Sequence, residues 1–315
     1  MAENSAALVA QQVIILLFVM LCGIYARKRN FITASSTSNF SKVLLSVCQP
    51  CLIISSFQVD YTEALLSTGL KVTLVSAIMH FSLIVVCLFI FNFIKDNSQR
   101  KIYRFSTIFG NCGFLGFPVL NAMYGDVGIF YGAFFTLVFH VVVWSYGIFM
   151  LTAGTGKKRF DVHQLKNMIN PGTVSTLVGV LLFAFQIKIP SPLIDGIDMV
   201  GDVTIPLSML VVGALIANTN FSRIFKNVHM YCFCAIKLLI LPFIAILICK
   251  LFNVDPTLLA PIAVIMTGTP AGTITASLAE LYGEDAVLGS ESVGISTILS
   301  IGSIPLMIYL ANLIL

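Results

Sequence analysis

The feature that most constrains this sequence is a succession of about ten apolar segments, most of them close to the length of a membrane-spanning helix. A helix needs about 20 apolar residues to cross a bilayer. Charged residues make up 10% of the chain and hydrophobic residues 58%, whereas a soluble domain carries roughly 25% charged residues. The sequence therefore predicts an all-α integral membrane protein of about ten transmembrane helices. The predicted spans are 6–26, 37–57, 64–94, 101–124, 128–152, 171–187, 193–217, 223–251, 256–281 and 286–314.

Basic residues alternate between successive loops and predict the orientation of the chain. They cluster after the first span, between the third and fourth, between the fifth and sixth, and before the eighth. Cytoplasmic loops are enriched in Lys and Arg, so we expect a multi-pass protein of the cytoplasmic (inner) membrane with both termini outside. The residues that carry this argument are Arg27, Lys28, Arg29, Lys95, Arg100, Lys101, Arg104, Lys157, Lys158, Arg159, Lys166, Arg223 and Lys226.

Short matches between the two halves predict an internal repeat. The sequence Met-Tyr-Gly-Asp at 123–126 recurs as Leu-Tyr-Gly-Glu at 281–284, 158 residues later. An odd number of spans in each half inverts the second half in the membrane, which is typical of secondary transporters. We expect residues 1–152 to form the first inverted repeat (spans one to five), 153–170 a cytoplasmic linker, and 171–315 the second repeat (spans six to ten).

Helix-breaking residues cluster in the fourth and ninth spans. Residues 109–118 read FGNCGFLGFP and residues 266–273 read MTGTPAGT. Inside a helix, Gly costs about 1 kcal/mol and Pro about 3 kcal/mol, so both spans are predicted to be broken near mid-membrane. Because the repeats are inverted, the positive N-terminal ends of the two following half-helices are expected to approach each other from opposite leaflets, where they favour an anion. The predicted substrate-binding residues are Gly110, Asn111, Cys112, Gly113, Gly268, Thr269, Pro270, Ala271 and Gly272.

Each break also contains residues that favour the start of a new helix. Asn111 and Thr269 are expected to accept hydrogen bonds from the first free N–H groups of the following half-helix. Pro270 is expected at the first helical position, where its missing N–H has no consequence. The alternative for Gly113, Gly116 and Pro118 is that they permit close packing or a kink.

Ionisable groups inside the predicted spans are further candidates. His140 and Glu291 are candidates for a coupling or support pocket. The alternatives are a packed, neutral His140 bonded to a backbone carbonyl, and a Glu291 at the inner interface of the membrane. Lys71 and Lys237 are expected to snorkel or pair locally, and His80 to belong to the packed interior. No His/Cys/Asp cluster has metal-ligand spacing, so no metal site is predicted.

The glycine-rich breaks and the residues around them resemble the auxin efflux carrier (AEC) family, which includes plant PIN-type carriers and bacterial malate or malonate permeases. The similarity extends over nearly the whole chain. It is clearest at 111–125, at Pro206 and Leu207 with Gly213, at Pro270 with Gly272, and at Pro305 with Leu306.

This resemblance implies a ten-helix inverted repeat with crossed, broken helices four and nine. It also implies a scaffold of spans one, two, six and seven, a transport domain of spans three to five and eight to ten, and an elevator mechanism. By the same resemblance, His140 stands where PIN carriers place a Gln that lines a second polar pocket. The chain departs from the plant pattern at Gly110, in place of Pro, and at Ala271, in place of Gln. These departures argue against a plant-type auxin substrate.

The sequence thus predicts a secondary-active or facilitative permease for a small organic anion, an auxin-like or malate-like mono- or dicarboxylate. One alternative is a sodium/proton antiporter-like carrier, which requires paired carboxylates at the crossing. Another is a non-transporting receptor or sensor, which requires a soluble output domain. No enzyme activity, cofactor, metal or nucleic acid is expected. The expected partners are the anion, the lipid bilayer and a second copy joined through the scaffold helices.

Overall fold

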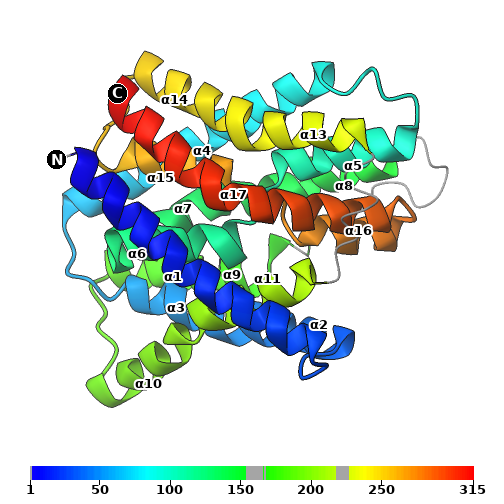
Figure 1. Cartoon of the computed structure of the whole chain (residues 1–315). Helices are drawn as coiled ribbons and strands as arrows, with labels where there is room; N and C mark the ends of the chain where they lie inside the picture. The colour runs from blue at the N-terminus through cyan, green and yellow to red at the C-terminus, as the bar shows by residue number, and fades with distance from the viewer. Residues whose placement is uncertain (1, 154–165, 167, 218–226) are drawn as a thin grey trace. The chain divides into compact units, whose positions relative to one another are not determined.

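The computed structural model describes residues 2–153, 166, 168–217 and 227–315, and these residues fold into helices (Figure 1). Within the described ranges there is no β-strand, and Gly110 and Ala271 form an isolated antiparallel bridge. The elements are α1 (Ala2–Lys28), α2 (Ala34–Val43), η1 (Leu44–Cys48), α3 (Gln49–Ser56), α4 (Glu63–Phe89), α5 (Asn97–Ile108), η2 (Cys112–Gly116), α6 (Phe117–Tyr124), α7 (Asp126–Val142), η3 (Val143–Gly147), α8 (Ile148–Thr152), α9 (Pro171–Ala184), α10 (Ser191–Asp202), α11 (Thr204–Ile216), α13 (Val228–Ala235), η5 (Ile236–Ile240), α14 (Leu241–Leu251), α15 (Leu259–Gly268), α16 (Ile274–Tyr282) and α17 (Ala286–Ile314).

The helices confirm the predicted all-helical membrane class. Each predicted span contains helix, and five helical stretches are long and apolar enough to cross a membrane. These are Glu63–Phe89, Asp126–Thr152, Ser191–Ile216, Val228–Leu251 and Ala286–Ile314. Shorter apolar helices are Cys112–Tyr124, Pro171–Ala184 and Leu259–Gly268. Most of the predicted linker 153–170 lies outside the described residues, as do Lys157, Lys158, Arg159, Arg223 and Lys226.

Polar side chains fix where several helices begin. The Asp96 carboxylate accepts the N–H of Gln99 at 2.9 Å at the start of α5, and Asn170 accepts the N–H of Thr173 at 3.1 Å at the start of α9. Asp285 does the same for the N–H of Leu288 at the start of α17. Such caps satisfy N–H groups that a helix leaves without partners in its first turn.

Two glycines end helices at matching places in the predicted repeat. Gly125 follows α6 with φ of 59°, and Gly283 follows α16 with φ of 72°. Both belong to the Tyr-Gly-acid motif that recurs 158 residues apart. A residue without Cβ adopts this left-handed backbone readily, so the motif encodes a helix stop in both halves.

The chain divides into two compact units, each with its own interior. Unit 1 consists of Met1–Leu74, Gly113–Leu137 and Ile169–Asn218. Unit 2 consists of Val75–Cys112, Val138–Met168 and Thr219–Leu315.

In unit 1, helices α1 and α11 pack with their backbones in close contact (Figure 1). A Cβ on Gly213 would lie 2.0 Å from the carbonyl oxygen of Met20, and one on Gly23 would lie 2.3 Å from that of Leu210. Small residues are what permit helices to approach this closely inside a membrane protein. The glycines therefore determine the distance between the two helices.

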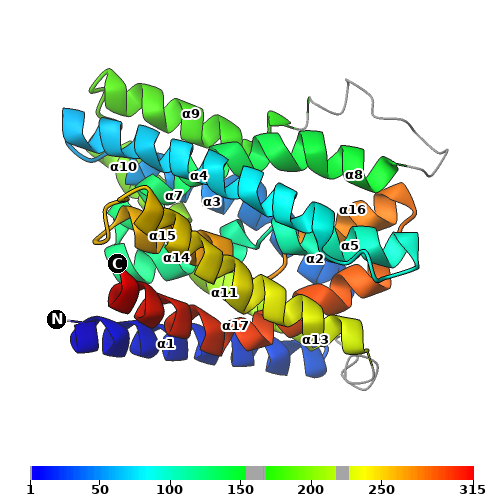
Figure 2. The same cartoon turned by 90° about the horizontal axis from the view of Figure 1, so that it is seen from above.

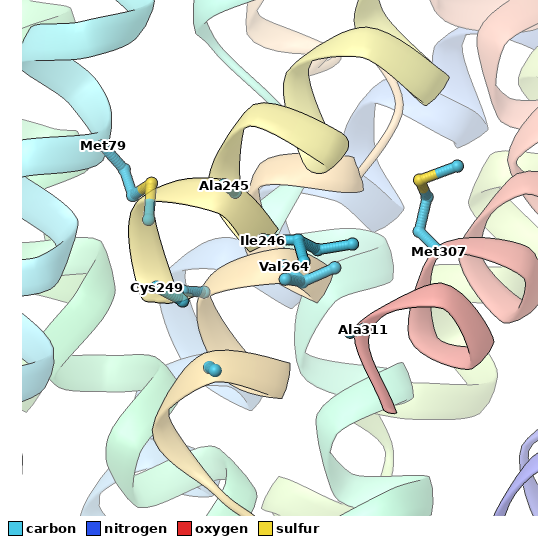
Figure 3. Packing of buried hydrophobic residues seen from close by; sticks show 9 residues of the cluster. Met79, Ala245, Ile246, Cys249, Val264, Met307 and Ala311 are labelled. Carbon is cyan, nitrogen blue, oxygen red and sulfur yellow. The ribbon is translucent and has the colours of Figure 1, made fainter. Parts of the chain in front are cut away.

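In unit 2, one apolar cluster joins α14, α15 and α17, which lie beside one another in Figure 2. Figure 3 shows its side chains, with Met79 of α4 on the side of α14 that carries Ala245 and Cys249. At this end of the unit, the Lys250 ammonium donates to the carbonyl of Ile314 at 2.9 Å. The cluster consists of Met79, Ala245, Ile246, Cys249, Ala260, Ala263, Val264, Met307 and Ala311.

The start of α5 is tied to the turn between α16 and α17, also within unit 2. The Lys101 ammonium lies 2.7 Å from the Glu284 carboxylate and donates to the carbonyl of Leu151 at 2.9 Å. The N–H of Asp285 donates to the hydroxyl of Ser98 at 3.0 Å. Helices α5, α8 and α16 therefore meet at one end of this unit (Figure 2).

Candidate functional site

The two glycine-rich stretches meet in the interior of unit 2. Helix α5 ends at Ile108 and the next helical turn begins at Cys112, whereas α15 ends at Gly268 and α16 begins at Ile274. Between these ends the two extended segments pair in antiparallel fashion. Asn111 donates its N–H to the carbonyl of Pro270 at 2.7 Å, and Gly272 donates its N–H to that of Phe109 at 2.9 Å. Residues 158 or more positions apart are thus held together by backbone hydrogen bonds.

Glycine is needed for this approach on both segments. A Cβ on Gly110 would lie 2.1 Å from the Thr269 hydroxyl oxygen, far inside the van der Waals distance. A Cβ on Gly272 would lie 3.0 Å from the carbonyl oxygen of Gly110. The close pairing therefore depends on the absence of side chains at both positions.

Backbone N–H groups of both breaks have hydrogen-bond partners. Those of Asn111 and Gly272 are used in the pairing, and the N–H of Ala271 donates to the Ser296 hydroxyl at 3.0 Å. Buried backbone groups pair wherever a partner is within reach, and here each break provides partners for the other. Free N–H groups must come from the first turns of the helices that follow.

The predicted roles of Thr269 and Pro270 as helix starters are wrong. The Thr269 hydroxyl donates backwards to the carbonyl of Met266 at 2.8 Å, so it satisfies the C-terminal end of α15. Helix α16 begins only at Ile274, and its flanking Thr273 makes no capping side-chain bond. Pro270 lies in the extended segment, where its carbonyl is the pairing acceptor. Pairing between the breaks outweighs the local capping preference.

Sequence reasoning missed the role of Lys237, which was expected to snorkel or pair locally. The side chain is 1% exposed, and its ammonium donates to the carbonyl of Thr107 at 3.0 Å and to that of Thr267 at 3.3 Å. These carbonyls belong to the last turns of α5 and α15. The sequence did contain a signal for this role, because an ionisable residue deep inside an apolar segment is a functional candidate. At 1.5 Å per residue, Lys237 lies about 14 Å from the start of its segment.

The other predicted residues occupy distinct surroundings. The thiol of Cys112 is 3.9 Å from the carbonyl of Met266, and a Cβ on Gly268 would lie 3.2 Å from the ring of Pro242. Gly113 belongs to unit 1, where a Cβ would lie 3.2 Å from the buried side-chain oxygen of Gln49. The structure therefore brings eight of the nine predicted residues into unit 2.

His140 and Glu291 also lie in unit 2. The rings of His140 and Phe139 are 5.5 Å apart, and the Phe139 ring packs edge-on against Phe109 of the first break at 5.9 Å. Glu291 is buried in α17, and the hydroxyl of the adjacent Ser292 is 3.9 Å from the sulfur of Met230. Their role as a coupling or support pocket stays a prediction.

A cavity of about 230 Å³ lies elsewhere, in unit 1. Its lining includes the aromatic rings of Phe57, Tyr61 and Phe183, and an exposed ion pair joins Lys188 to Asp60 at 3.0 Å. None of the predicted binding residues lines it.

The sequence as a whole is similar to transporters. Residues 8–308 match the family described as membrane transport protein. The uncharacterized transporter MJ1031 of Methanocaldococcus jannaschii is 22% identical over 306 residues, which cover 92% of this chain and 94% of that protein. The uncharacterized transporter YfdV of Escherichia coli K12 is 22% identical over 318 residues, which cover 95% of this chain and 96% of that protein.

Proposed function

Since the chain belongs to the membrane transport protein family, the auxin efflux carrier family that its sequence resembles, we propose that it carries a small organic anion across the membrane. The family makes it a multi-pass membrane protein whose substrate is a small molecule. The proposed substrate class is a short mono- or dicarboxylate. The proposed site is the pair of breaks at Gly110 and Ala271.

The observation that carries this proposal is the antiparallel pairing of the two breaks. Irregular backbone inside a membrane protein is tolerated where protein or a water-filled cavity surrounds it, and transporters place substrates at such interruptions. A helix begins directly after each break, at Cys112 and at Ile274. Helix starts attract anions through free N–H groups and the positive end of the dipole.

The division of the chain supports an elevator mechanism as part of the proposal. The elements assigned to the scaffold, α1 to α3 and α9 to α11, all belong to unit 1. The paired breaks belong to unit 2, together with α13 to α17. Helices α4 and α7, assigned to the transport domain, are divided between the units, and α6, assigned to it as well, lies in unit 1. The matched helix stops at Gly125 and Gly283 support the inverted repeat.

The composition of the breaks disfavours a sodium/proton antiporter. Residues 109–113 and 266–273 contain no Asp or Glu. The ammonium of Lys237 contacts the last turns of the helices that lead into the two breaks, and its sign opposes a cation. A carrier for an anion fits these residues better.

Substitution of Gly110 tests the proposed site. We expect malonate or malate to raise the melting temperature of the purified protein and to be taken up into proteoliposomes. Gly110→Ala should weaken both effects about tenfold or more, equivalent to about 1.4 kcal/mol, because its Cβ would collide with the Thr269 hydroxyl. Gly302→Ala is the matched control, since a Cβ there has no neighbour within 4 Å.

Two results would count against this function. One is a sodium-driven proton flux in the absence of carboxylates, which would favour the antiporter. The other is carboxylate uptake that Gly110→Ala leaves unchanged, which would place the site elsewhere.

A further inference from the structure

The charge of the paired breaks cannot come from their helix ends alone. A helix end carries about half an elementary charge, positive at the N-terminus and negative at the C-terminus. Two C-terminal ends, those of α5 and α15, meet two N-terminal ends, those at Cys112 and Ile274. Partial charges of opposite sign and equal size largely cancel. The N–H groups of the two helix starts remain available to an anion, but the four helix ends together supply little net charge to attract it.

Lys237 shifts this balance of partial charges towards positive charge. Its ammonium contacts the carbonyls of Thr107 and Thr267 in the last turns of α5 and α15, so it offsets both negative ends. What remains is an excess of about one positive charge, carried by the ammonium and the two helix starts. A Cβ on Gly110 would lie 3.3 Å from the Lys237 nitrogen, so the ammonium lies directly beside the first break.

We propose that Lys237 determines the charge selectivity of the site, with the carboxylate of the substrate serving as the counterion of its ammonium. This inference rests on the proposed function and names the residue that makes its site prefer an anion to a cation. The described residues supply two neutral carbonyl acceptors for an ammonium that has three hydrogens to donate.

A second buried lysine in the same unit shows the contrast. Lys101 lies 2.7 Å from the carboxylate of Glu284, so its charge is balanced within the protein. The ion pairs among the described residues are Lys101 with Glu284 and Lys188 with Asp60. Lys237 has carbonyl partners and no carboxylate among them. A buried charge is costly unless a counterion pairs with it, and a bound anion supplies that counterion.

Two substitutions separate the charge of Lys237 from its hydrogen bonds. Lys237→Gln retains N–H groups that donate to the two carbonyls and removes the charge. Lys237→Arg retains both. Lys101→Gln is the control for loss of a buried lysine at the other end of α5. Three probes of similar shape carry two, one and no negative charges. They are malonate, its mono-amide malonamate and its neutral diamide malonamide.

We expect the wild-type protein to bind these probes in the order malonate, malonamate, malonamide. Lys237→Gln should weaken malonate binding about tenfold or more, reduce the ratio of malonate to malonamide affinity towards one, and retain cooperative unfolding. Lys237→Arg and Lys101→Gln should keep the wild-type ratio. Affinities are read from the ligand dependence of the melting temperature, which follows mass action.

Three other outcomes would count against the role of Lys237 or against the proposed function. A Lys237→Gln protein that melts earlier but keeps the wild-type affinity ratio would reduce Lys237 to a structural role, while the proposed function would stand. If Lys237→Gln does not fold, a wild-type protein that binds malonamide as tightly as malonate overturns the inference. A wild-type protein stabilised by no carboxylate overturns the proposed function itself.

Discussion

Individual side chains complete the pairing of the two breaks. The backbone of each break bonds to the other, but the N–H of Ala271 and the carbonyls of Thr107 and Thr267 take side-chain partners from α17 and η5. Ser296 and Lys237 are therefore part of the proposed site although neither lies in a glycine-rich stretch. Both come from helices whose sequence reads as an ordinary apolar span.

Ser296 provides a test at this scale. Ser296→Ala leaves the buried N–H of Ala271 without its partner, which we expect to cost about 1–3 kcal/mol of stability and to weaken carboxylate binding. Ser296→Thr keeps the hydroxyl and should restore much of both. Ser300→Ala is the control, because the Ser300 hydroxyl donates to the carbonyl of Thr297 in its own helix. The role of Ser296 is measured by the melting temperature and the malonate affinity of all three variants. Equal behaviour of Ser296→Ala and Ser300→Ala contradicts the role of Ser296.

Among whole helices, glycines determine both length and spacing. Gly125 and Gly283 stop α6 and α16 through their left-handed backbone, and Gly110 and Gly272 allow two extended segments to touch. Gly213 has a different task, since it brings α11 against the backbone of α1. The same residue type thus ends helices, pairs breaks and packs helices, depending on its surroundings.

Helix spacing in unit 1 can be tested at Gly213. Gly213→Ala places a Cβ 2.0 Å from the carbonyl oxygen of Met20, so α1 and α11 must move apart. Overpacking of this kind costs about 1–3 kcal/mol, and we expect a lower melting temperature. Gly196→Ala in α10 is the matched control, because its Cβ meets nothing within 4 Å and Ala favours helix by about 1 kcal/mol. A Gly213→Ala protein as stable as Gly196→Ala would mean that the two helices do not need this contact.

For the molecule as a whole, the positions of the chain turns bear on its orientation in the membrane. In unit 2, the start of α5 and the turn between α16 and α17 are joined by Lys101 and Glu284 at one end. The first segment was predicted to lie at the cytoplasmic face from its basic residues. Ten spans with both termini outside place the turn between spans nine and ten at the same face. Their direct contact agrees with that assignment, which stays a prediction.

Cysteine labelling tests the orientation. In a background without the eight native cysteines, residues introduced at Glu63 and Asp126 should react with a membrane-impermeant maleimide on intact cells. A cysteine at Lys95 should react only after the cells are broken, because basic loops stay in the cytoplasm. All three positions are exposed, so differences in reactivity report the side of the membrane. Labelling of the Lys95 position on intact cells would reverse the predicted topology.

The amino-acid sequence by itself determined the helical membrane class, the approximate position of the spans, the family and the two places where helices are interrupted. These depend on the length of apolar segments and on the backbone preferences of Gly and Pro, which act within a few residues. Only the tertiary structure decided what the interruptions do. It paired Asn111 with Pro270 and Gly272 with Phe109, turned the Thr269 hydroxyl towards α15, and placed the Lys237 ammonium at two helix ends. A local pattern predicts a free helix start, but a segment 158 or more residues away can satisfy the same buried groups, and such a partner is visible only once the chain has folded.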